Sequence, residues 1–142
     1  MTRVFHEVNW LAVIVASLVY FMLGVPWFSP ATLGPIWEQS IGFQRPAGWE
    51  PGAILYIGPL LASFTASLST AIPARATRSN SLGDGVILGL VVALGYSVAV
   101  AGVDAISPSH PAPARLFLIT GSYHLVGLIA VAMIVTKWRT TS

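Results

Sequence analysis

The stretch LGDGVILGLVVALGYSVAVAGV, residues 82–103, decides the fold class, because Asp84 is its only charged residue. About 20 consecutive apolar residues are enough for one α-helix to cross a bilayer. Ser81 and Asp84 have the spacing of a capping box, in which each side chain bonds to the other residue's backbone N–H. The stretch therefore predicts a transmembrane helix that begins at Leu82.

The rest of the chain has the same character. Of 142 residues, 55% are hydrophobic and 8% are charged, whereas soluble domains carry about 25% charged residues. Further apolar runs predict spans at about 8–25, 52–72 and 113–136. We therefore expect a single all-α domain, residues 1–142, that forms a bundle of four transmembrane helices. The chain has no cysteine, which excludes disulfides and thiolate chemistry, and a dispersed net charge of +2 does not suggest nucleic-acid binding.

The first connection contains a further amphipathic pattern. Ser29 and Pro30 suit the first positions of a helix, and Leu33, Ile36 and Trp37 share one face of it. We expect a short interfacial helix at about 30–41; a loop packed over the bundle is the alternative. Tryptophans gather where spans meet the two interfaces, and the expected interface anchors are Trp10, Trp27, Trp37 and Trp138.

Small residues recur at every fourth position in two spans. Such rows let helix backbones approach closely in a membrane. We expect the second and third spans to pack tightly through them, against each other or against a neighbouring protomer. The third span contributes Gly85, Gly89, Ala93, Ser97 and Ala101, and the second contributes Gly58, Ala62 and Ala66.

His124 is the only histidine expected deep in the membrane. It follows Arg115 by nine residues, or about 14 Å of helix. A buried polar layer is expected around it, and Tyr123, about 100° away on the same helix, need not share the site. A histidine hydrogen-bonded for structure is our preferred interpretation; a proton, ion or solute pathway, ligation of a metal or tetrapyrrole, and acid–base catalysis are the alternatives. The other expected members of the polar layer are Tyr20, Thr65, Tyr96 and Ser97.

Charged residues near the membrane surfaces carry less information. Asp104 and Arg115 flank the third connection, where they could pair, although two solvated interfacial charges are the simpler interpretation. Basic residues predict the orientation, because they concentrate in cytoplasmic segments. Both termini are expected in the cytoplasm, since one side would hold Arg3, Arg75, Arg78, Lys137 and Arg139, and the other Arg45 and Arg115.

Two blocks of sequence resemble a small bacterial membrane-protein family, catalogued as domain of unknown function 1761. The first block is Val8-Asn9-Trp10-Leu11-Ala12-Val13, then Trp27-Phe28-Ser29-Pro30, Leu33-Gly34 and Trp37. The second is Arg115-Leu116-Phe117-Leu118-Ile119, then Tyr123-His124-Leu125. Phe28 and Thr120 depart from the family's usual tyrosine and asparagine. The resemblance implies a four-span inner-membrane protein, and no activity.

These patterns lead to an expected function. We expect a non-enzymatic accessory or structural subunit of a homo-oligomer or larger membrane complex in the bacterial inner membrane. A small channel or transporter with His124 in its pathway is the alternative, and a tetrapyrrole- or lipid-binding membrane protein is a more distant one. No catalytic constellation is visible. We expect membrane lipids and other membrane-protein subunits as partners, and no cofactor.

Overall fold

The computed structural model describes residues 5–138 and is helical throughout its regular parts. Arg3 and Arg139, which entered the orientation argument, lie outside this range. Four helices are long and apolar enough to cross a membrane, which confirms the all-α prediction. They are α2 (Trp10–Trp27), α4 (Ile54–Ala76), the third span (Leu82–Ala105) and α7 (Pro113–Lys137), with a short α3 (Gly34–Ser40) between the first two.

Local sequence signals explain where several helices begin. The Asn9 side chain accepts a hydrogen bond from the Ala12 backbone N–H at 3.2 Å, so α2 begins at Trp10. Ser81 and Asp84 form the expected capping box at the start of the third span. Pro113 occupies the first turn of α7, where its missing N–H costs no helical hydrogen bond.

Two expected boundaries were wrong. The second span does not end at Ile72: α4 continues through Pro73, whose carbonyl accepts hydrogen bonds from both the N–H and the hydroxyl of Thr77. The short helix does not begin at Pro30, because the residues after α2 form a turn in which the Gly34 N–H bonds to the Ser29 carbonyl at 3.1 Å.

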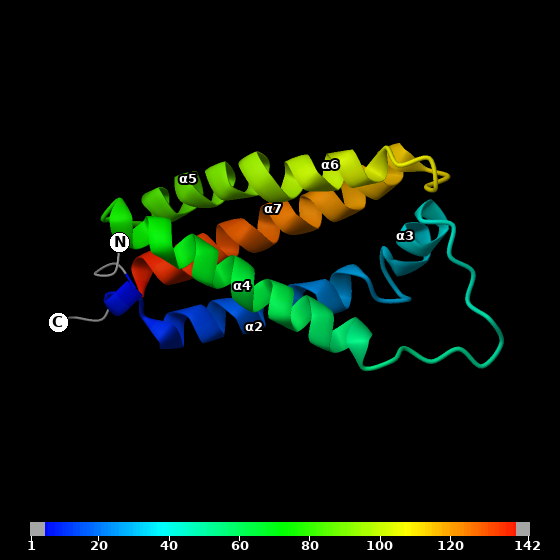
Figure 1. Cartoon of the computed structure of the whole chain (residues 1–142), viewed down its shortest axis with the longest axis horizontal. Helices are drawn as coiled ribbons and strands as arrows, with labels where there is room; N and C mark the ends of the chain where they lie inside the picture. The colour runs from blue at the N-terminus through cyan, green and yellow to red at the C-terminus, as the bar shows by residue number, and fades with distance from the viewer. Residues whose placement is uncertain (1–4, 139–142) are drawn as a thin grey trace.

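Helix α7 lies at the centre of the bundle and contacts α2, α4 and the third span. In Figure 1 the third span runs along α7, while α4 crosses α2 on the other side. The short α3 sits at one end of the bundle, beside the turn between α6 and α7, and contacts α7. The start of α2 and the end of α7 lie together at the opposite end, where Asn9 donates to the Trp138 carbonyl at 3.2 Å.

The third span is one helix with a π-helical segment inside it. It consists of α5 (Leu82–Val92), η1 (Ala93–Val98) and α6 (Ala99–Ala105), and η1 is the π segment. In an α-helix each four-residue step overshoots a full turn by about 40°, so a row of small residues drifts around the helix. The wider π turn reverses this drift, which explains why Gly85, Ala93 and Ala101 are all buried.

The row of small residues in the third span packs against α7. The expected contact of this row with the second span, α4, was wrong. A Cβ added to Gly85 would lie 2.8 Å from the Met133 Cα, and one added to Gly89 would lie 2.6 Å from the Ile129 Cα. These distances leave no room for a side chain, so backbone meets backbone. The pattern predicted close packing, and the structure shows that the partner is the fourth span.

Candidate functional site

His124 forms a hydrogen bond with another span at the centre of the bundle. Its Nδ1 lies 2.5 Å from the hydroxyl of Tyr20, which comes from α2. Tyr20 is almost fully buried, at 4% exposure, and His124 is half-buried. The structure thus brings together two residues of the expected polar layer that are 104 positions apart in the sequence.

Tyr123 belongs to the same site, which the sequence argument did not require. Its ring stacks on Tyr20 with centroids 5.2 Å apart, and its hydroxyl donates to the Tyr20 carbonyl at 3.1 Å. Ser63 of α4 is buried close to the Tyr123 side chain. Tyr123 points about 100° away from His124 on α7. Its long side chain nevertheless reaches Tyr20 across the interface between α7 and α2, so it is part of the site.

Two glycines make space for the tyrosine pair. A Cβ on Gly127 would lie 2.2 Å from a ring carbon of Tyr20, and one on Gly24 would lie 3.2 Å from the Tyr123 hydroxyl. The Tyr20 ring therefore rests directly on the backbone of α7. Neither glycine belongs to the predicted rows, although Gly24 and Gly127 both lie within apolar spans where such close approaches are common.

An aromatic chain connects this site to the first connection. Phe28 packs edge-on against Tyr123 and Trp37, with centroids 5.2 and 5.5 Å away. The Trp27 indole N–H donates to the Ile119 carbonyl of α7 at 3.2 Å. Trp27 and Trp37, expected as interface anchors, are half-buried among these rings, whereas Trp10 and Trp138 are exposed.

A groove borders the other side of His124. It has a volume of about 410 Å³ and runs between the end of the third span and α7. Tyr96 and Ser97, expected in the polar layer, lie here rather than in the core. Its lining residues are Tyr96, Ser97, Val100, Ala101, Asp104, Thr120 and His124; we call it the His124 groove.

Thr65 is not part of either arrangement, so its expected membership was wrong. It is exposed on α4, and its hydroxyl bonds to the Leu61 carbonyl of its own helix at 2.9 Å. The buried hydroxyls of α4 are Ser63, Ser67 and Thr70. Positions that face into the bundle and positions that face away from it are only two residues apart on a helix. A uniformly apolar sequence does not reveal which positions face inward.

The interfacial charges do not pair with each other. An ion pair joins Arg45 and Glu38 at 2.5 Å in the first connection. An Arg115 nitrogen lies 3.4 Å from the Gln39 side-chain oxygen of α3, and Asp104 is exposed at the edge of the His124 groove. Asp104 and Arg115 therefore do not form the ion pair that was one of the two sequence interpretations; whether both charges are solvated at the interface stays a prediction.

The row of small residues in α4 is only partly packed. Thr70 is buried and Ala66 is half-buried against the bundle. Toward the start of the helix, Ala62 is exposed, and a Cβ added to Gly58 would have no neighbouring atom within 4 Å. The first half of α4 therefore presents small residues to the surroundings of the molecule.

Polar side chains hold the opposite end of the bundle together. The Arg75 guanidinium of α4 donates to the carbonyls of Val135 and Trp138 at 3.3 and 3.1 Å. These carbonyls lie in the last turn of α7, where helical partners run out and the helix dipole favours a cation. Asn9 donates to the same Trp138 carbonyl, so α2, α4 and α7 are joined at this end.

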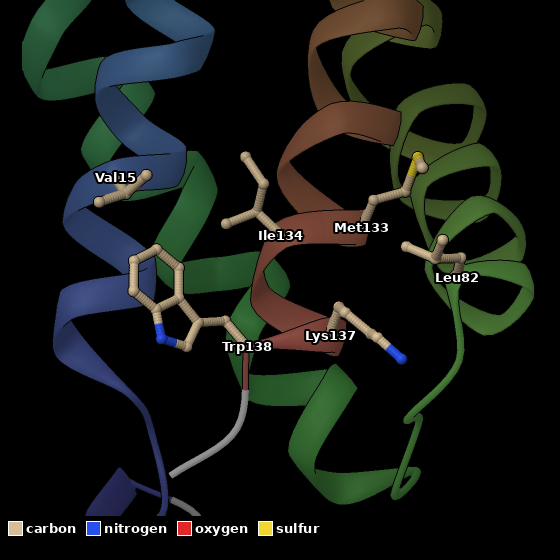
Figure 2. A pocket seen from close by; sticks show the side chains of 6 residues that line it. All are labelled: Val15, Leu82, Met133, Ile134, Lys137 and Trp138. Atoms are coloured by element: carbon tan, nitrogen blue, oxygen red, sulfur yellow. The ribbon is translucent and has the colours of Figure 1, made fainter.

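A second, larger groove of about 530 Å³ lies near this end (Figure 2). Val15 of α2 and Ile134 of α7 face its inner part, and Trp138 closes it below Val15. Lys137 is its only charged lining residue. The groove is otherwise apolar, and it lacks the convergent polar groups that mark a specific ligand site.

The fold and the site define a multi-pass membrane protein with four apolar helices and a Tyr–His contact between two of them. The family model "Protein of unknown function (DUF1761)" matches residues 11–136, and the chain belongs to this family. Comparisons with curated proteins and with solved structures found no match. Within residues 5–138 no group of three or more metal-binding side chains occurs.

Proposed function

We propose that the protein is a non-enzymatic structural or accessory subunit of a homo-oligomer or larger membrane complex. The observation that carries this proposal is the uncovered small-residue face at Gly58 and Ala62 on α4. Lipid supplies no hydrophobic drive between helices, and small residues favour close helix–helix contact. A second helix from another protomer or subunit would fit against this face.

The bond between His124 and Tyr20 supports the same role. It joins α2 to α7 through side chains that are both part of the fold, as expected of a histidine used for structure. Tyr20, the hydroxyl partner of His124, is almost fully buried, which favours a bond used for structure over one used for catalysis.

The proposal includes a place and an orientation: the bacterial inner membrane, with both termini in the cytoplasm. Arg75, Arg78 and Lys137 lie at the ends of spans next to the start of α2, and Arg45 and Arg115 belong to the opposite end. This distribution agrees with the rule that basic residues concentrate on the cytoplasmic side.

Native mass spectrometry of the protein released from membranes tests the assembly. We expect an oligomer or a stable complex, and we expect Ala62→Leu to reduce it strongly because the larger side chain separates the facing helices. Gly95→Leu is the control outside the proposed face, since no atom lies within 4 Å of a Cβ at Gly95. A monomer as the only species would contradict the proposal.

A small channel or transporter is the second candidate, and the His124 groove favours it. The groove brings Asp104 at the end of a span and His124 inside the bundle to one surface depression. For a pathway, His124→Ala abolishes flux in proteoliposomes and leaves the melting temperature unchanged. For the structural role, the same variant melts at a lower temperature and assembles poorly.

A further inference from the structure

The hydrogen-bond network fixes which nitrogen of His124 carries the proton. The Tyr20 hydroxyl has one partner among the described residues, the His124 Nδ1. A buried phenol needs an acceptor for its proton, so Tyr20 donates and Nδ1 accepts. A neutral imidazole with an accepting Nδ1 carries its hydrogen on Nε2. The Nε2–H is therefore a donor, and no residue between 5 and 138 accepts its hydrogen bond.

Other hydrogen-bond donors without partners line the same groove. The Thr120 hydroxyl oxygen is buried and has no hydrogen-bond partner within residues 5–138. The hydroxyls of Ser97 and Tyr96 border the groove as well, and Tyr96 is 70% exposed. An unsatisfied polar group facing hydrocarbon costs several kcal/mol. The His124 groove therefore favours a ligand that brings a hydrogen-bond acceptor.

The charge of the groove selects a neutral acceptor. Its only formally charged lining residue is Asp104, at the end of the third span, and no lysine or arginine lines it. A carboxylate at the edge disfavours an anionic headgroup such as a phosphate, because like charges repel. A carbonyl oxygen accepts hydrogen bonds without carrying a net charge.

The depth of the groove in the membrane restricts which neutral ligands can reach it. Tyr96 precedes Asp104 by eight residues, which corresponds to about 12 Å along the helix, while half of the hydrocarbon core measures about 15 Å. With Asp104 near the boundary, Tyr96 and His124 lie deep in the hydrocarbon, below the level of phospholipid ester groups. A compound that carries its carbonyl into the hydrocarbon fits this position.

We propose that the His124 groove binds a lipid-soluble carbonyl compound of the quinone class. One carbonyl oxygen accepts from the His124 Nε2–H, and the flat ring lies against the exposed face of Tyr96. The volume of about 410 Å³ is within the range of small-molecule sites and accommodates one substituted ring. The proposal concerns binding alone and is independent of the subunit role, since one protomer supplies every residue involved.

Nitrogen-15 NMR of histidine-labelled protein in nanodiscs tests the site. Only His6, His110 and His124 contribute signals, and His124→Gln identifies the third. Without ligand, we expect His124 to have an accepting Nδ1 and a protonated Nε2. Decylubiquinone should shift the His124 Nε2–H signal saturably and leave His6 and His110 unchanged, whereas decane, which has a tail but no carbonyl, should leave all three unchanged.

Two variants and a change of phospholipid distinguish quinone binding from other causes of a signal shift. Thr120→Val should weaken the decylubiquinone response by about three- to tenfold, the equivalent of one ordinary hydrogen bond. Thr65→Val, the same change at an exposed hydroxyl outside the groove, should leave it intact. The proposal would be overturned if the His124 signal differed between ester-linked and ether-linked phospholipid but did not change with decylubiquinone, because the groove would then bind phospholipid. A His124 signal that changes neither with the phospholipid nor with decylubiquinone would also overturn it.

Discussion

Single residues decide how the tyrosine pair fits between α2 and α7, and Gly127 is the clearest case. A Cβ at this position would lie 2.2 Å from the Tyr20 ring, so Gly127→Ala forces the ring away from His124. We expect a loss of stability of about 1–3 kcal/mol, as for other overpacked cores, measured by thermal unfolding in detergent. Gly95→Ala, in open space, should be neutral; equal melting temperatures for the two variants would contradict the packing described here.

The bond between Tyr20 and His124 has a measurable coupling energy. A double-mutant cycle of Tyr20→Phe and His124→Ala should give about 0.6 kcal/mol and at most about 1.7 kcal/mol, the range known for hydrogen bonds between membrane helices. The pair Tyr20→Phe and Thr65→Val should be additive, because Thr65 bonds to its own helix. Additivity in both cycles would show that the contact does not stabilise the fold.

The site residues show which part of a polar layer a sequence can reveal. His124 was recognisable because an ionisable group inside a span is rare, and a hydroxyl from another span was the natural partner. Which hydroxyl it would be was not predictable, because every span offers one or more at similar depth. Tyr20 is the partner because Gly127 leaves space for its ring, a detail that depends on how two helices meet.

At the scale of helices, the contact between α5 and α7 depends on glycine. A Cβ at Gly89 would meet backbone atoms of α7 at 2.6 Å, and backbone cannot move aside as a side chain can. We expect Gly89→Ala to separate the helices and lower the melting temperature by several degrees, because overpacking costs about 1–3 kcal/mol. Gly83→Ala is the control on the same helix, where the nearest atom would lie 3.7 Å away.

Helix boundaries were predictable where side chains cap them, and less so elsewhere. Asn9, Ser81 and Pro113 each mark a start that the structure places within two residues of the expectation. The partner of the small-residue row was not predictable, because four uniformly apolar helices give no pattern that distinguishes a face toward one neighbour from a face toward another. The π segment was missed for a related reason, since no residue type marks it.

At the scale of the whole molecule, the proposed orientation can be tested with single cysteines. The chain has none of its own, so each introduced thiol reports on one position. In intact cells, a membrane-impermeant maleimide should label Ala47→Cys in the first connection and leave Asn80→Cys unlabelled until the cells are opened. The reverse pattern would place both ends of the chain outside the cytoplasm.

The π segment gives this chain an uneven tolerance of length changes. Because η1 holds one residue more per turn than the α-helix around it, removing one residue between 93 and 98 would leave an ordinary helix that still spans the membrane. Because the wider π turn takes up the additional residue locally, Ala101 and Ala105 would keep their contact with α7 in that shortened chain. Removing one residue from α5 instead would rotate the two sides of the deletion by about 100° relative to each other, so the glycines and Ala101 could no longer face α7 together. Two shortened chains with nearly the same hydropathy would then differ in whether the bundle assembles. For this span, the place of a length change therefore matters more than the change in length itself.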